Sequence, residues 1–258
     1  MGHIRLGTLP RTRRWQEVID LIGCGAKSAA VAAATLDAIN DDLGRAADDA
    51  GVSHSFWLLT QIPEAARKDD FAGALRGLGF QISDLPSGAE LLAGFTAAVD
   101  RFLVAAKTRS GPAELGQLAA VETLATLIRD RTPSLFAPTP GEIRSALAKA
   151  GTEVQFGKLA RSYFARFTER YVSYFLSKEL PQHVGPGRRF VTLGEERSFA
   201  SALELHCQQA CKIVEVFSGA WYSKNRFQRT LTSAGTGRFL AYALKKVRSE
   251  LRRGGSAA

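Results

Sequence analysis

Residues 152–180 read TEVQFGKLARSYFARFTERYVSYFLSKEL, and this stretch decides the fold. Its aromatic and small apolar residues recur at spacings of three and four, which is the period of one helix face. The spacing predicts a helix from about Thr152 to Leu180, ended by Pro181 because proline cannot continue a helix. Aromatic rows of this kind usually pack against other helices, so we interpret the stripe as core and not as a stacking platform for bases or a cofactor. Its members are Phe156, Ala160, Tyr163, Phe164, Phe167, Tyr171, Tyr174 and Phe175.

The rest of the chain is a succession of helical patterns separated by short glycine or proline breaks. The best strand candidate, residues 190–193, is only four residues long. We therefore predict an all-α fold, a multi-helix bundle or helical array with negligible β content. Three helix starts carry a capping box, in which a cap hydroxyl and a carboxylate or amide three residues on satisfy the first backbone donors. The boxes are Ser87 with Glu90, Thr139 with Glu142, and Thr152 with Gln155; the second also has a proline, Pro140, at the first helical position.

Length and composition indicate an ordinary globular protein, with 258 residues, 45% of them hydrophobic and 23% charged. The best boundary lies in the proline-containing segment 131–141. We divide the chain there into a near-neutral helical region, residues 1–132, and a strongly basic helical region, residues 133–258, although one continuous domain fits equally well. The glycine-containing end, residues 254–258, is expected to be disordered.

Three cysteines are too few for a disulfide framework, and no apolar signal-peptide core follows the N-terminus. The most apolar stretch, residues 29–39, is far shorter than the roughly 20 residues that a membrane span needs. These features predict a cytoplasmic protein without a membrane segment. Abundant alanine, with 24 arginines against 10 lysines, favours a bacterial origin from a GC-rich genome.

The net charge of +9 is unevenly distributed. Residues 1–150 carry 16 lysines and arginines against 17 acidic residues, whereas residues 151–258 carry 18 against 8. Beyond Gly219, nine basic residues face only Glu250. Apolar residues in the last helix form a stripe, and basic residues line an adjacent face, which predicts one docked side and one exposed side. The stripe is Leu240, Leu244, Val247 and Leu251, and the basic face is Arg238, Lys245, Arg248 and Arg252.

A cationic surface of this kind suits a phosphate backbone, because fixed cations release condensed counterions, and nearby aromatic side chains can stack on unpaired bases. The leading hypothesis is a non-enzymatic accessory protein that binds nucleic acid through this basic surface, within a bacterial multi-protein assembly. The alternative is an interaction subunit of a multi-gene bacterial system, such as anti-phage defence or secretion, whose basic end docks on an acidic protein. The candidate binding residues are Lys224, Arg226, Arg229, Arg238, Lys245, Arg248 and Arg252, with Trp221, Tyr222, Phe227 and Tyr242 as candidate stacking residues.

Two further basic clusters are candidates for anion binding. The glycine-containing loop 183–189 carries Arg188 and Arg189, which could hold a phosphate together with backbone amides. A flexible basic connector has the same sequence pattern, so both interpretations stay open. The N-terminal arginines, Arg5, Arg11, Arg13 and Arg14, lead into a helix expected to start at about Thr12, and we expect this arm to pack on the protein.

No catalytic motif is complete. The stretch from Gly23 to Ser28 lacks the glycine spacing of a nucleotide-binding P-loop and indicates a turn between two helices. Cys207 and Cys211 share a helix face near His206, but the further ligands of a zinc site are missing, so buried thiols are the favoured interpretation. We therefore expect no catalytic residues, no cofactor and no metal. An enzyme whose residues converge from distant segments is the third hypothesis.

Overall fold

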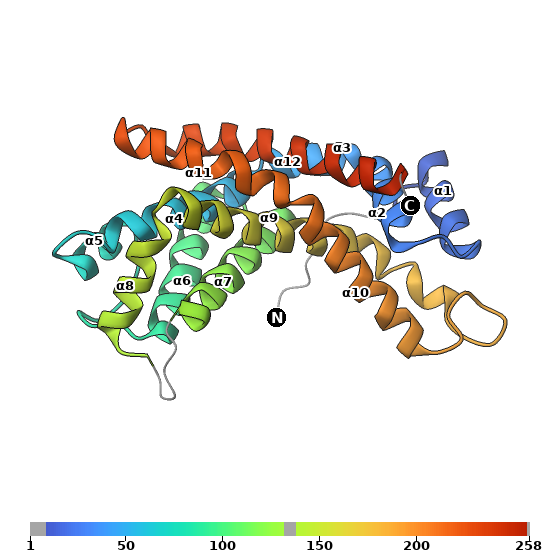
Figure 1. Ribbon diagram of the computed structural model, residues 1–258, viewed down its shortest axis with the longest axis horizontal. Coiled ribbons are helices and arrows are strands. Elements are labelled where there is room, and N and C mark those ends of the chain that lie inside the picture. The colour runs from blue at the N-terminus through green and yellow to red at the C-terminus, as the bar shows by residue number, and fades with distance from the viewer. Residues whose placement is uncertain (1–8, 132–137, 257–258) are drawn as a thin grey trace.

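The computed structural model describes residues 9–131 and 138–256, and throughout these ranges the chain is an array of α-helices, as predicted (Figure 1). Between the 3₁₀-helix Leu180–His183 and the α-helix Leu193–Ala210, Val184 and Phe190 form an isolated β-bridge and no strand, so the predicted strand at 190–193 is wrong. Thr192 instead caps a helix that starts at Leu193. The helices are α1 (Arg13–Gly23), α2 (Ser28–Ala38), α3 (Asn40–Ala47), α4 (Ala50–Ala65), α5 (Phe71–Gly77), α6 (Gly88–Ala106), α7 (Gly111–Arg131), α8 (Pro140–Ala150), α9 (Glu153–Leu176), the 3₁₀-helix η1 (Leu180–His183), α10 (Leu193–Ala210), α11 (Lys212–Phe227) and α12 (Ser233–Ser256).

Helix starts follow the side-chain caps in the sequence. The Ser87–Glu90 and Thr139–Glu142 boxes are both formed reciprocally, and Thr12 caps α1 as expected. The third box is wrong, because the Thr152 hydroxyl donates to the Lys149 carbonyl oxygen at 3.2 Å instead of capping α9. α8 and α9 follow each other so closely that the end of one helix takes up the cap residue of the next.

The long helix α9 ends at Leu176, four residues before the predicted end. A proline ring clashes with the carbonyl group four residues earlier, which for Pro181 is that of Ser177, the C-cap of α9. The chain makes a turn there and continues as η1. The disagreement therefore comes from placing the stop at the proline itself instead of one turn before it.

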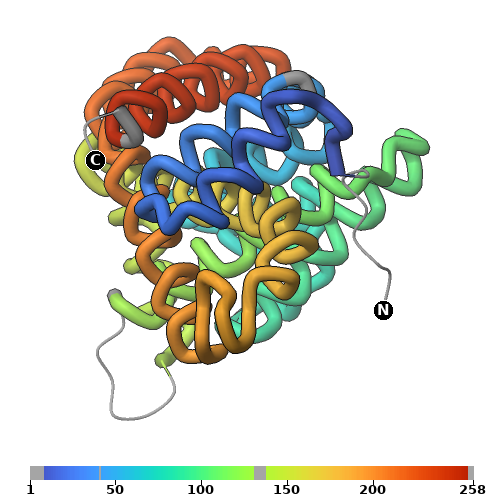
Figure 2. Tube along the Cα trace, turned by 90° about the vertical axis from the view of Figure 1, so that its right-hand side faces the viewer, coloured from blue at the N-terminus to red at the C-terminus, as the bar shows by residue number. Residues whose placement is uncertain are grey.

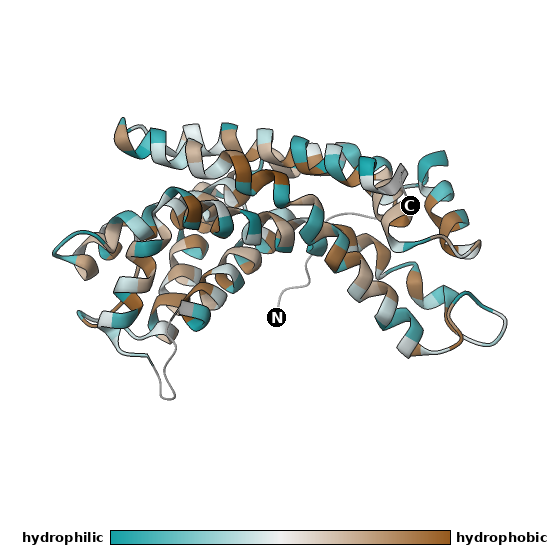
Figure 3. Cartoon of the chain, viewed as in Figure 1, coloured by the Kyte–Doolittle hydropathy of each residue, from teal (hydrophilic) through white to brown (hydrophobic). Residues whose placement is uncertain are grey.

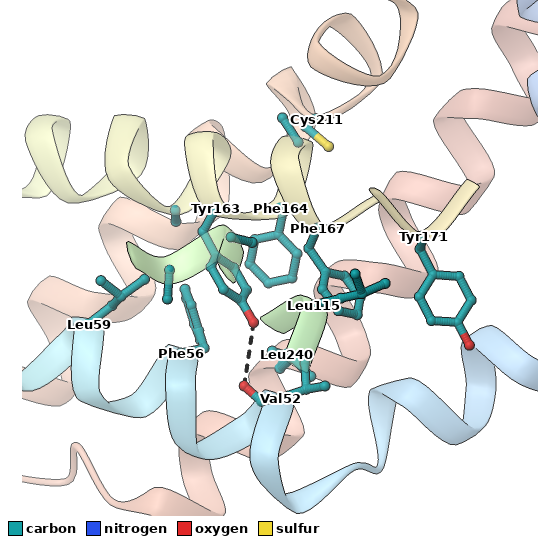
Figure 4. Packing of buried hydrophobic residues seen from close by; sticks show 14 of the residues in the cluster. Val52, Phe56, Leu59, Leu115, Tyr163, Phe164, Phe167, Tyr171, Cys211 and Leu240 are labelled. Atoms are coloured by element: carbon teal, nitrogen blue, oxygen red, sulfur yellow. Dashed lines mark hydrogen bonds between the residues drawn. The ribbon is translucent and has the colours of Figure 1, made fainter. Parts of the chain in front are cut away.

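Seven of the eight stripe members of α9 are buried in the core, as predicted, and Tyr174 is half-buried against it (Figure 4). Phe164 packs edge-on against Phe56 of α4 at a centroid distance of 5.2 Å, and Phe156 stacks on Tyr222 of α11 at 3.9 Å. Such pairs contribute about 0.5–1.5 kcal/mol each beyond the apolar area they bury. Tyr163 is fully buried and donates a hydrogen bond to the Val52 carbonyl oxygen at 3.4 Å. α9 is therefore the central element, covered by helices from both parts of the sequence.

The helices form an arched array around α9 (Figures 1 and 2). α12 runs along one side of the molecule, where it packs on α2, α4, α10 and α11. α6, α7 and α8 lie toward one end of α9 and α10 toward the other. One hydrophobic cluster includes residues from α1 through α12. The predicted boundary at 132/133 falls outside the described residues, and the division into two regions stays a prediction.

Hydrophilic residues are interspersed along all the surface helices in Figure 3. In the two described ranges, none of the helices combines the length and the apolar character that crossing a bilayer requires.

Candidate functional site

The basic C-terminal segment folds as a helical hairpin of α11 and α12. Its turn is closed by the Thr230 amide, which donates to the Asn225 carbonyl oxygen at 2.8 Å, and Arg229 takes a left-handed conformation with a φ of 55°. α12 buries the apolar stripe identified in the sequence: Leu240, Leu244, Val247 and Leu251 are all at most 3% exposed. The opposite face of α12 is thereby turned to solvent.

Five cations of the hairpin point outward. They are exposed, and within the described part of the chain none of them forms an ion pair with a carboxylate. Lys246 lies over the ring of Tyr242 at 5.5 Å. We call this set the hairpin cation surface, defined as Lys224, Arg229, Arg238, Lys245 and Lys246.

Three other predicted binding residues are placed differently. Arg226 pairs with Glu64 of α4, with Nε 2.9 Å from Oε1, and also donates to the Gly151 carbonyl oxygen. Arg252 pairs with Asp37 of α2. Arg248 is half-buried. The two ion pairs join residues 162 and 215 positions apart, so the sequence offered no local signal for them.

The candidate stacking residues divide in the same way. Phe227 is 90% exposed and Tyr242 50% exposed, so both rings are accessible beside the cations. Trp221 is half-buried and stacks on Phe239 at 4.0 Å. Tyr222 is buried and donates to Glu64 Oε1 at 2.7 Å, so neither of these two can receive a base.

The loop 183–189 is tied down by its own hydrogen bonds. The Gly185 amide donates to the Phe190 carbonyl oxygen at 2.8 Å, and the Phe190 amide donates to that of His183 at 3.0 Å. Arg188 donates to the Gln182 carbonyl oxygen and Arg189 to that of Ala26, each at 2.6 Å. Both guanidinium groups thus bond to backbone carbonyls on different segments, and the anion site at Arg188 and Arg189 stays a prediction.

The remaining candidates for chemistry do not assemble. Gly25, with a φ of 84°, lies in a turn between α1 and α2, which agrees with the interpretation of residues 23–28 as a turn. Cys207 and Cys211 are buried thiols, as expected. His206 packs against the end of α12, and the Nε2 atom of His183 lies 3.4 Å from Oε1 of Glu179. Within residues 9–131 and 138–256 there is no cluster of three or more His, Cys, Asp and Glu side chains suited to a metal.

A charged groove on α9 was missed in the sequence. It has a volume of about 560 Å³, and α9 forms one side of it while α7, α10 and α11 complete it. Ser162 and Ala165 are small residues in the middle of the α9 contribution. We call it the α9 groove, lined by Glu122, Lys158, Arg161, Ser162, Ala165, Arg166, Glu169, Arg170, Glu204, Gln208 and Glu215.

Two ion pairs cross between the helices that line the α9 groove. Arg161 pairs with Glu215 of α11 at 3.0 Å, and Arg170 pairs with Glu122 of α7. A signal for the α9 side of the groove was available in the sequence. The lining residues of α9 follow one another at alternating spacings of three and one, from Lys158 to Arg170, which is the pattern of one helix face. The partners on α7 and α11 are 48 and 54 residues away, and no local pattern pointed to them.

Comparisons with protein-family models, curated proteins and solved structures found no match. The candidate functions therefore depend on the geometry of the hairpin cation surface and of the α9 groove.

Proposed function

We propose that the protein is a non-enzymatic nucleic-acid-binding protein that contacts the phosphate backbone through the hairpin cation surface. The observation that carries this proposal is the set of outward cations without carboxylate partners in the described ranges, of which Arg238 and Lys245 lie two helical turns apart on one face of α12. Backbone phosphates would neutralise these cations and release counterions, whereas a surface of internal ion pairs would gain nothing from a polyanion.

The accessible aromatic rings favour single-stranded nucleic acid. Phe227 and Tyr242 flank the cations and are exposed on the same hairpin. An exposed ring can stack on an unpaired base of any identity, which contributes about 1–3 kcal/mol per base and little sequence preference. In a duplex the bases are already stacked on each other, so these two rings would have no base to stack on.

The test is fluorescence anisotropy with a labelled 20-nucleotide single strand. Five phosphate contacts predict a slope of log K against log salt of about −3.5, or roughly a 100-fold loss of affinity between about 50 and 200 mM salt. The triple change Lys224→Glu, Arg238→Glu and Lys245→Glu should abolish binding at about 200 mM salt without unfolding the protein, since all three side chains are exposed.

The matched control is Lys68→Glu, Arg197→Glu and Lys149→Glu, which alters the net charge equally at exposed sites outside the hairpin, on α10, on α8 and in the turn after α4. This control should retain most of the affinity. Equal losses of affinity in the two triple variants would indicate a net-charge effect and would refute the assignment of the binding site to the hairpin. Affinity that is absent at about 50 mM salt, or unaffected by salt, would remove the proposal itself.

A second candidate is docking on an acidic protein partner. It is favoured by Val216 of α11, which is 77% exposed on the same hairpin as Phe227. Exposed apolar side chains such as these two contribute more to binding a protein surface than to binding phosphate. A stoichiometric complex that survives nuclease and high salt, and that Val216→Ser with Phe227→Ser disrupts, would favour this function over the first.

A further inference from the structure

The α9 groove holds charges of both signs that are not paired with each other. The Arg166 Nη2 atom donates to the Thr126 hydroxyl at 2.8 Å, a neutral partner, and its buried Nε has no hydrogen-bond acceptor among the described residues. The Glu169 carboxylate accepts from the Ser173 hydroxyl at 2.9 Å. The carboxylate of Glu204 accepts from the Gln208 amide at 3.0 Å.

The neighbouring ion pairs show how charges that stabilise the fold are arranged in the same groove. Arg161 and Arg170 are each bonded to a carboxylate on another helix. Arg166, between them on α9, is not, although the groove holds two further carboxylates. Holding a guanidinium and a carboxylate partly desolvated and apart destabilises a fold, because each loses water without gaining the other. A ligand that brings the missing partners would remove that cost.

We propose that the α9 groove binds a small zwitterionic ligand, whose phosphate or carboxylate contacts Arg166 and whose ammonium group contacts Glu169 and Glu204. A volume of about 560 Å³ is in the range of small-molecule sites. Ser162 and Ala165 leave the middle of the α9 side open, so a ligand can reach both charges at once. Lys158 offers a second cation to the anionic group.

The electrostatics around Glu169 are consistent with an ammonium partner. Burial raises the pKa of Glu169, and the nearby carboxylates of Glu204 and Glu122 raise it further, against the opposing effects of Ser173 and Arg170. Burial raises the pKa of the Cys207 thiol on α10 to about 12, and the carboxylates of Glu169 and Glu204 contribute to this rise. A cation bound beside Glu169 would favour its ionised form.

The test is isothermal titration calorimetry with two zwitterions, phosphoethanolamine and γ-aminobutyrate, and two controls that carry charge of one sign only, ethyl phosphate and ethylamine. At least one zwitterion should bind, and at least about tenfold more tightly than either control, because two charge-assisted hydrogen-bond sets form instead of one. If neither zwitterion binds, or if a control binds equally well, the proposal is overturned.

Variants separate a binding role from a structural one. Arg166→Gln and Glu169→Gln should each weaken zwitterion binding at least about tenfold. Arg129→Gln, at an exposed cation of α7 outside the groove, should leave it unchanged. Because ionised Glu169 is disfavoured by its surroundings, Glu169→Gln should unfold at the same or higher urea concentration at pH 8 while losing affinity.

The exposed carboxylate of Glu204 provides a second variant if a change on α9 prevents folding. Glu204→Gln should fold normally. Relative to the wild type, it should lose more affinity for phosphoethanolamine than for ethyl phosphate. If both single variants, Glu204→Gln and Glu169→Gln, keep the zwitterion affinity of the wild type, the ammonium group binds elsewhere. That result would refute its assignment to Glu169 and Glu204. The hairpin cation surface shares no residue with this groove, so the outcome does not depend on nucleic-acid binding.

Discussion

His54 on α4 shows how one residue couples packing to protonation. Its ring stacks on Phe102 at a centroid distance of 3.8 Å, with an angle of 6° between the planes, and lies 5.4 Å from Trp57. Burial among these rings lowers the pKa of His54 from 6.5 to about 4. The imidazole is therefore neutral in the folded protein at physiological pH.

This pKa predicts a pH dependence of stability. Because the unfolded chain takes up the proton at higher pH than the folded one, the contribution of His54 to the free energy of unfolding is lost as the pH falls from 6.5 to about 4. His54→Phe keeps the stacked ring without the titration, so the variant should lose less stability over this range. Urea unfolding of both proteins between pH 7 and pH 4 measures the difference. Parallel pH profiles would contradict the prediction.

Single residues were also the scale at which the sequence was easiest to interpret. The boxes at Ser87 and Thr139 were predictable because a cap acts on backbone donors three residues away. Thr152 failed because its hydroxyl is bonded to the end of the preceding helix, although the local pattern is the same. The partner of a side chain is predictable only where the competing partners are also local.

At the scale of elements, the packing of α9 on α11 depends on two glycines. A Cβ atom at Gly219 would lie 2.4 Å from the Glu153 carbonyl oxygen, and one at Gly157 would lie 2.7 Å from that of Glu215. Both clashes are with backbone, which cannot rotate away as a side chain can. The two helices approach so closely because neither has a side chain at these points.

We therefore expect opposite effects from the same substitution at two positions. Gly219→Ala should destabilise the protein by about 1–3 kcal/mol, since the added methyl forces α9 and α11 apart. Gly44→Ala, on α3 with no atom within 4 Å of the new Cβ, should stabilise it by roughly 0.5–1 kcal/mol through helix propensity. Denaturant unfolding of both variants measures the two changes. A stabilising Gly219→Ala would show that the helices can separate at no cost.

Elements also show where periodicity stops being informative. The aromatic side of α9 was predictable because its spacing indicates burial whatever it packs against. The charged side of the same helix follows an equally regular spacing, yet regular charge is typical of any solvated helix face. The α9 groove exists because Glu122 and Glu215 are brought to it from α7 and α11, which depends on packing and not on pattern.

At the scale of the whole molecule, both parts of the chain contribute to one hydrophobic core. Leu240 and Leu244 of α12 belong to the same cluster as Leu36 of α2 and Phe56 of α4. The ion pairs Arg226–Glu64 and Arg252–Asp37 join the same two parts at the surface. The charge count correctly located the excess of basic residues, but these long-range pairs were beyond its reach.

A shared core predicts cooperative unfolding. We expect a single calorimetric transition whose van't Hoff and calorimetric enthalpies agree, because neither region can unfold without exposing apolar surface of the other. Differential scanning calorimetry of the full chain measures this ratio. Two resolved transitions would instead support the division at residue 132 into independent domains.

The placement of the three cysteines makes the native chain ready for site-specific attachment of a dye. Cys24 is exposed at the turn after α1, whereas Cys207 and Cys211 are enclosed in the core with the pKa of each thiol raised by burial. A maleimide should therefore modify one position while the fold is intact and reach the other two only when α10 is released from its neighbours. The extent of labelling thus reports opening of the centre of the molecule without any engineered substitution.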